Sequence, residues 1–179
     1  MTMYPELAGP ALQAHREAVE EMKRRARREL NVGDDQIVVR DLLPQDVGGS
    51  ASTPDYYCNV KALGFGDILA KVNDAIGAQT VGDNRWLAIE GVALNGTATI
   101  NTEPVVQQIR VTRKGSVARY WDIAPVTKFQ HSAGWADDPV IVDQNTTVQV
   151  EALARTAATT SALRLLGTVV EKRGLLINP

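Results

Sequence analysis

The chain has few of the residues on which metal and covalent chemistry usually depend. Its 179 residues include one cysteine, Cys58, and two histidines, His15 and His131. A single cysteine excludes an internal disulfide and any metal site made of cysteines alone. The two histidines are far apart in the sequence, so neither a zinc site nor the paired-histidine metal face of cupin-type jelly-roll enzymes is predicted. We expect no bound metal or other cofactor.

Long apolar stretches and a strong net charge are also lacking. No run of about eighteen apolar residues occurs, so no membrane-spanning segment is predicted. The N-terminus lacks a basic stretch followed by an apolar one, so we expect no secretory signal and synthesis in the cytoplasm. Because the formal net charge is −2, the molecule as a whole favours neither nucleic acid nor an anionic membrane.

Sequence motifs of catalysis are missing as well. There is no G-x-S-x-G nucleophile elbow and no phosphate-binding loop, and Gly64 and Gly66 lack the third glycine of a dinucleotide loop. We therefore expect that the protein is not an enzyme. A β-sandwich hydrolase with two catalytic carboxylates would leave no motif, so it stays an alternative. The acidic pairs Asp34-Asp35 and Asp137-Asp138 are more typical of turns than of a calcium site, which needs about six oxygen ligands.

The first element that the sequence does predict is a helix over residues 6–30. Apolar side chains recur there at steps of three and four, which places them on one helix face. They are Leu7, Ala11, Ala14, Ala18, Met22, Ala26 and Leu30. Most are alanines, so we expect this stripe to lie on a larger surface, and Asn31 with Gly33 supplies the stop. We predict a helical arm over residues 1–33 and a separate body over residues 34–179.

The second half of this helix carries a dense basic cluster. Its members, which follow the apolar Met22, are Lys23, Arg24, Arg25, Arg27 and Arg28. Three interpretations are open: a solvated face balanced by glutamates of the same helix, docking onto acidic groups of another protein, or neutralisation of nucleic-acid phosphates. No aromatic residue lies between the cations, so nucleic acid is not favoured. Met22 and the five cations form the candidate interaction site.

The body has a β pattern almost to its C-terminal end. The predicted strands are Gln36–Leu43, Tyr56–Leu63, Trp86–Leu94, Val105–Arg113, Val117–Ile123, Val140–Val142, Thr146–Ala154 and Leu163–Glu171. Turns are predicted at Asn95-Gly96, Lys114-Gly115 and Asp143–Asn145, and residues 64–78 are ambiguous. We predict a mainly β fold of about eight strands, a single jelly roll or related antiparallel sandwich, with an N-terminal helix.

The three tryptophans differ in their setting. Trp86 and Trp121 lie in predicted strands, so we expect them in the core. Trp135 lies in a predicted loop, where an exposed ring would suit an interface hot spot, and packing over one end of the sandwich is the alternative. Trp135 and Tyr120 would also serve as sugar platforms in a carbohydrate-binding β-sandwich, the second function that we consider.

Three segments carry a resemblance to a known family: Trp86–Leu94, Pro104–Val111 and the closing Leu165–Gly174. With the strand order, they resemble the single jelly-roll virion proteins of double-stranded DNA viruses, either small capsid subunits or head-decorating proteins. The resemblance is one of pattern over roughly residues 35–175. It implies a viral structural protein located in the virion, present in many copies in a symmetric shell, with itself and other virion proteins as partners. It also implies an N-terminal arm that reaches a neighbouring subunit, and it transfers no catalytic residue.

Overall fold

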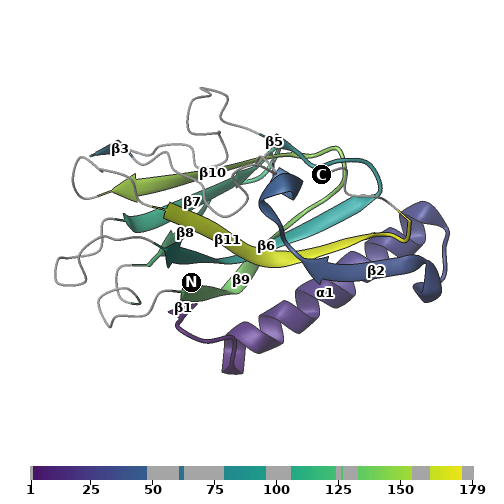
Figure 1. The fold of residues 1–179 in the computed structure, drawn as a ribbon, viewed down its shortest axis with the longest axis horizontal. Helices are drawn as coiled ribbons and strands as arrows, with labels where there is room; N and C mark the ends of the chain where they lie inside the picture. The colour runs from purple at the N-terminus through teal and green to yellow at the C-terminus, as the bar shows by residue number, and fades with distance from the viewer. Residues whose placement is uncertain are drawn as a thin grey trace.

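The protein is mainly β, with one long helix at its N-terminal end (Figure 1). The computed structural model describes residues 2–47, 61–62, 79–95, 106–123, 126, 133–154 and 162–174. The helical elements are α1 (Gly9–Leu30) and two short 3-10 helices, η1 (Asp34–Gln36) and η2 (Pro44–Val47). The strands are β1 (Met3–Tyr4), β2 (Ile37–Asp41), β3 (Lys61–Ala62), β5 (Gln79–Thr80), β6 (Arg85–Asn95), β7 (Val106–Arg113), β8 (Arg119–Asp122), β9 (Ala133–Val142), β10 (Thr147–Ala154) and β11 (Ala162–Lys172).

The strands form two sheets. The first sheet is antiparallel throughout, in the order β1-β9-β6-β11-β2. In the second sheet β10, β7 and β8 are antiparallel neighbours, and β10 also pairs with β3 in parallel and with β5 antiparallel. The prediction of a mainly β fold with antiparallel sheets and an N-terminal helix is therefore confirmed.

The main core lies between the two sheets. Leu87 and Ile89 of β6 contribute from the first sheet, and Val111 of β7 and Val150 of β10 contribute from the second. None of these four side chains is more than 1% exposed. Full burial of such a side chain contributes about 1.5–3 kcal/mol, so this core holds the two sheets together. Trp121, on β8, is also fully buried here, as the sequence predicts.

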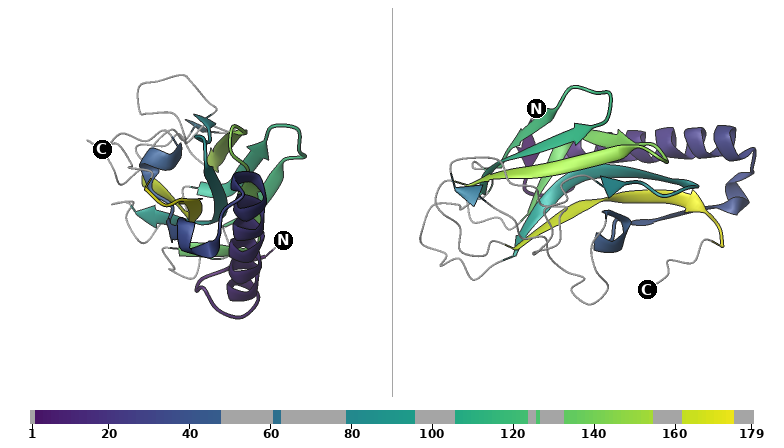
Figure 2. Two further views of the ribbon diagram at one scale, coloured as in Figure 1. Left: turned by 90° about the vertical axis from the view of Figure 1, so that its right-hand side faces the viewer. Right: turned by 90° about the horizontal axis from the view of Figure 1, so that it is seen from above.

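The opposite face of the first sheet carries a second core beneath α1. Trp86 and Ala88 alternate with Leu87 along β6, so their side chains leave the sheet on the other side. They pack with Val170 of β11 and Met22 of the helix, and all four are fully buried. The molecule thus has three layers, α1, the first sheet and the second sheet, with the helix running along the outside of the strands (Figure 2).

The ends of α1 follow from local chemistry. The helix begins at Gly9 rather than at Glu6, with Pro10 in its first turn, where a missing N–H and a fixed φ cost nothing. It ends at Leu30, because Asn31 adopts the left-handed conformation with a φ of 51° and its N–H returns to the carbonyl of Arg27. The predicted stop at Asn31 is confirmed.

Most predicted strands of the body agree with the structure, and β9 is the exception. The sequence predicts a strand only over Val140–Val142 and a loop over Gly134–Pro139. In the structure β9 begins at Ala133, because residues 133–136 pair with β6 and β1. The prediction of a loop was wrong.

Two predicted turns are confirmed by backbone angles that favour glycine or asparagine. Gly115, between β7 and β8, has a φ of 80°, and Asn145, between β9 and β10, has a φ of 57°. The predicted strand Tyr56–Leu63 is described only at β3. The ambiguous residues 64–78, Cys58 and His131 lie outside the described residues.

Candidate functional site

The apolar stripe of α1 packs against its own chain. Met22 is fully buried, and Ala18 and Ala26 are at most 4% exposed, all against the second core around Trp86 and Val170. The stripe that was predicted to lie on a larger surface therefore lies on the first sheet of the same molecule. Docking of the helix on an adjoining subunit stays a prediction, and it would require the helix to leave this face.

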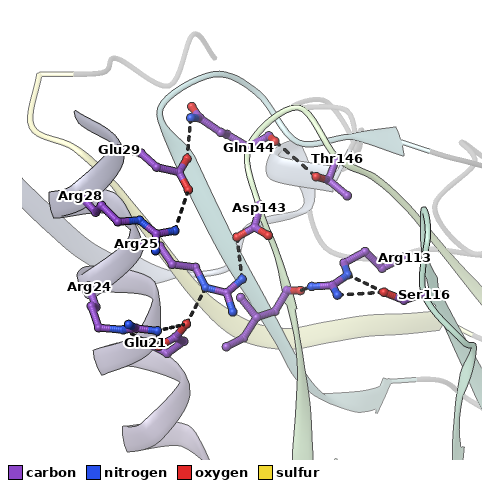
Figure 3. Close-up of polar contacts among 11 residues, drawn as sticks. Glu21, Arg24, Arg25, Arg28, Glu29, Arg113, Ser116, Asp143, Gln144 and Thr146 are labelled. Carbon is purple, nitrogen blue, oxygen red and sulfur yellow. Dashed lines mark hydrogen bonds and ion pairs between the residues drawn. The ribbon is translucent and has the colours of Figure 1, made fainter. Parts of the chain in front are cut away.

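Within the basic cluster, Arg25 ties the helix to the turn after β9. Its guanidinium donates from Nη1 to Oδ1 of Asp143 at 2.8 Å and from Nε to Oε1 of Glu21 at 2.7 Å (Figure 3). Hydrogen bonds from Arg25 and Arg24 lower the pKa of Glu21, so this carboxylate stays ionised well into the acidic range. Arg25 is 24% exposed, and its contacts lie within the chain.

The other four cations of the cluster also have acidic partners. The pairs and their nitrogen–oxygen distances are Lys23–Glu20 at 2.8 Å, Arg24–Glu21 at 2.7 Å, Arg27–Asp34 at 2.9 Å and Arg28–Glu29 at 3.8 Å. This arrangement favours a solvated face balanced by its own carboxylates. Arg28 has the longest of these contacts and its side chain is 70% exposed, so it is the most available of the five to another molecule.

A hollow of about 590 Å³ lies beside the turn between β7 and β8. Apolar side chains of Val111, Val140 and Ile141 line it, together with Arg113 and Ser116. Arg113 is fixed there, because its Nη1 donates to the carbonyl oxygen of Ile141 at 2.8 Å and its Nε and Nη2 donate to Oγ of Ser116 (Figure 3). The lining of the hollow is therefore apolar in part, and it includes a guanidinium that is hydrogen-bonded on both of its sides.

Exposed apolar side chains gather at the same turn. Val117, which also lines the hollow, is 87% exposed, and Tyr120 on β8 is 47% exposed. Among the described residues, one other large apolar side chain is exposed. It is Val39, which is 41% exposed and lies on β2 of the first sheet. The β7–β8 turn is thus the place where exposed apolar surface and a hollow coincide.

Trp135 lies in strand β9 and is half-buried. It is paired with Tyr4 of β1 and with Gly91 of β6. Tyr120, the other aromatic residue of the predicted sugar platform, belongs to β8 of the second sheet. The two rings therefore come from different sheets, and the structure does not bring them together on one sheet face.

A buried carboxylate lies between α1 and the first sheet. Glu90 of β6 is 2% exposed, and its Oε2 lies 3.0 Å from Nδ1 of His15 on the helix. Its other oxygen, Oε1, makes no hydrogen bond to any described residue. Burial raises the pKa of Glu90 above its usual range; His15 and Thr168 act against this rise, and the charge of Asp41 adds to it.

Glu90 lies at a bulge in β6, the central strand of the first sheet. Its neighbours Ile89 and Gly91 are aligned with residues of both β9 and β11, but Glu90 has no aligned partner in either strand. A Cβ added to Gly91 would collide with the backbone of Gly134, so only glycine fits beside the bulge. Glu90 faces the helix because it lies two positions after Ala88, whose side chain is on that side of the sheet.

His15 and Glu90 were not among the residues singled out from the sequence, although each leaves a signal. His15 lies four positions after Ala11 and three before Ala18, which places it on the buried face of the helix. Gly91 within a strand pattern indicates a bulge or a close backbone approach. Neither signal reveals that the two side chains meet, because that depends on how the helix lies across the sheet.

A second buried ionic cluster joins β2, β6 and β11. Arg40 donates to both carboxylate oxygens of Asp46, each at 2.7 Å, and to both of Glu171 at 2.9 and 3.1 Å. Arg85 donates to Glu171 at 2.9 Å. Two guanidinium groups thus balance two carboxylates, with Asp46 and Glu171 at most 7% exposed. This cluster is electrically balanced and closed, so it serves to join the strands.

The described residues contain no group of three or more His, Cys, Asp or Glu side chains placed to hold a metal ion. No helix in this part of the chain is both long and apolar enough to cross a membrane. No family model matches the sequence, and no curated protein matches it.

Proposed function

We propose that the protein is a structural subunit of a virion, a capsid or capsid-associated protein that assembles with itself through its β-body. The mainly β architecture of two largely antiparallel sheets supports this proposal. That these sheets form a single jelly roll is part of the proposal. In this proposal α1 stays on the first sheet as part of the subunit, since its apolar stripe is already buried there.

The observation that carries the proposal is the coincidence of Val117 with the hollow at the β7–β8 turn. Val117 is 87% exposed, and it adjoins a hollow of about 590 Å³ that Val111, Val140 and Ile141 line in part. A protruding valine beside a partly apolar hollow would let each copy insert its valine into the hollow of the next, and a head-to-tail contact of this kind can repeat into a closed ring. Tyr120, 47% exposed on the adjoining strand, would extend the contact.

The assembly state of the purified full chain tests the proposal. Light scattering over a range of concentrations and salt, with negative-stain imaging, should show large regular particles or symmetric rings. A mass of 19.4 kDa at every concentration, with no regular particle in the images, would contradict self-assembly. Weak association is expected to strengthen with a kosmotropic salt such as sulfate, which favours burial of the apolar part of the contact.

A further inference from the structure

Glu90 is the buried carboxylate in the described part of the chain that has an oxygen without a hydrogen-bond partner, and His15 is its neighbour on the helix. Glu90 projects from the bulge of β6 into the layer between the first sheet and α1. One carboxylate oxygen has His15 at 3.0 Å, and the other is buried without a hydrogen bond to any described residue. A buried polar atom without a hydrogen bond destabilises the folded state, and more so when it is charged.

The elements packed around Glu90 offer it little compensation. Helix α1 contributes His15, whose side chain is 27% exposed, and β11 contributes the hydroxyl of Thr168. Strand β2 contributes Asp41, a like charge that disfavours an ionised Glu90. His15 is therefore the group in this set that can supply a positive charge.

The number of protons held by the pair decides whether it is balanced. With one proton, Glu90 and His15 form either an ion pair or a neutral acid beside a neutral imidazole. Neither state leaves an unpaired negative charge on the buried carboxyl group. Without that proton, an ionised carboxylate lies buried beside a neutral ring, with one oxygen unsatisfied and Asp41 nearby. Burial of a charge without a partner is strongly unfavourable, so the deprotonated pair favours any state in which Glu90 reaches water.

Glu90 would become exposed to water if α1 moved away from the first sheet. The helix contacts the first sheet mainly through small residues, Ala18 and Ala26, with Met22 as its large buried side chain. This second core is a cluster separate from the one between the sheets. The helix layer can therefore loosen while the two-sheet core stays intact, as local unfolding of a weakly packed unit.

We propose that His15 and Glu90 share a single proton that keeps α1 seated on the first sheet, and that loss of this proton at rising pH loosens the helix. The closed state binds more protons than the loosened one, so the stability of the helix layer falls as pH rises. The raised pKa of Glu90 agrees with this direction. The stability that the protonated carboxyl contributes is complete at acidic pH and is lost as pH rises through the raised pKa. This behaviour belongs to the single chain and does not require assembly.

Hydrogen exchange followed by mass spectrometry tests the proposal in the full-length protein. Peptides from α1 are compared with peptides from β10 in the same sample, at about pH 6 and about pH 9, so that the chemical effect of pH cancels in the ratio. We expect α1 to lose protection relative to β10 at the higher pH, by about tenfold or more, because the deprotonated pair leaves a buried charge without a full set of partners. An α1-to-β10 ratio that does not change with pH would overturn the proposal.

Two substitutions separate a shared proton from ordinary packing. Glu90→Gln keeps the shape and removes the charge, so it should abolish the pH dependence and keep α1 protected at the higher pH. His15→Gln keeps the carboxylate but removes its proton-sharing partner, so α1 should loosen already at the lower pH. Glu17→Gln, on the exposed face of the same helix, is the control and should behave as wild type. If Glu90→Gln and His15→Gln both loosen α1 alike at every pH, the role of the pair is merely structural and the proposal fails.

Discussion

The two buried ionic groups of this protein have opposite character, although both involve the first sheet. In the Arg40 cluster, two guanidinium groups and two carboxylates satisfy one another, and both oxygens of Asp46 and of Glu171 are bonded. Under the helix, Glu90 shares one contact with His15 and leaves its second oxygen without a described partner. Balanced buried charges hold strands in place, whereas an incompletely balanced one makes stability depend on protonation.

Removing Arg40 should break the balanced cluster and gives the largest expected effect. Arg40→Met leaves the buried carboxylates of Asp46 and Glu171 without their main partner, so the free energy of unfolding should fall by about 3–5 kcal/mol in urea titrations. Arg119→Gln is the matched control, since Arg119 and Asp138 form an exposed pair at 3.0 Å that contributes about 0–1 kcal/mol. Equal effects of the two substitutions would remove the distinction between a buried network and a surface pair.

Truncation of Met22 should weaken the packing of α1 on the first sheet and make the helix more sensitive to the protonation of Glu90. Met22→Ala removes the large side chain that α1 buries, so we expect a loss of about 2–5 kcal/mol, measured by chemical unfolding. The helix should then loosen at lower pH than in wild type, because less packing opposes the deprotonated pair. Gln13→Ala, on the exposed face, should stay within about 0.5 kcal/mol of wild type.

Removing the charge of Glu90 should remove the pH dependence of stability while the first sheet stays folded. Wild-type stability should decline as pH rises, because burial raises the pKa of Glu90 and the folded state holds the extra proton. Glu90→Gln should therefore gain stability over wild type with increasing pH, reaching about 1–3 kcal/mol under alkaline conditions. Urea unfolding of both proteins over a pH series measures this difference, and a difference independent of pH would count against the shared proton.

The smallest effects are expected in the basic cluster. Arg25→Gln breaks contacts to Asp143 and Glu21 that solvent partly screens, so we expect a loss of about 0.5–1 kcal/mol that shrinks with added salt. Lys23→Gln should change unfolding by less than about 0.5 kcal/mol, because its pair with Glu20 is exposed. A large loss from Lys23→Gln would show that this face is more than a solvated surface.

Local pattern predicts the elements of this fold better than the contacts between them. The stripe at Met22 and the stop at Asn31 predict α1, and the apolar run around Leu87 predicts β6, because these signals depend on near neighbours in the sequence. The strand at Trp135 was missed, since Pro139 and the acidic residues before it are typical of a turn, whereas the pairing of Trp135 with β1 and β6 is a long-range contact.

The candidate sites show the same limit. The sequence identifies the cations after Met22 but not their partners, and Asp143, which holds Arg25, is far away along the chain. The importance of Glu90 follows from the register of three strands and the placement of the helix, which no local pattern encodes. Sequence therefore points to residue types, while the role of each depends on tertiary neighbours.

The particle mass of two aspartate variants tests the proposed assembly contact most directly. Val117→Asp places a charge on the side chain that would enter the hollow of a second copy, and Val39→Asp places the same charge at the other exposed valine, on β2. We expect Val117→Asp to reduce the mass measured by light scattering to that of small species, while Val39→Asp keeps the mass of the wild-type assembly. Unchanged assembly in Val117→Asp, in a protein that remains folded, would contradict the β7–β8 turn as the contact.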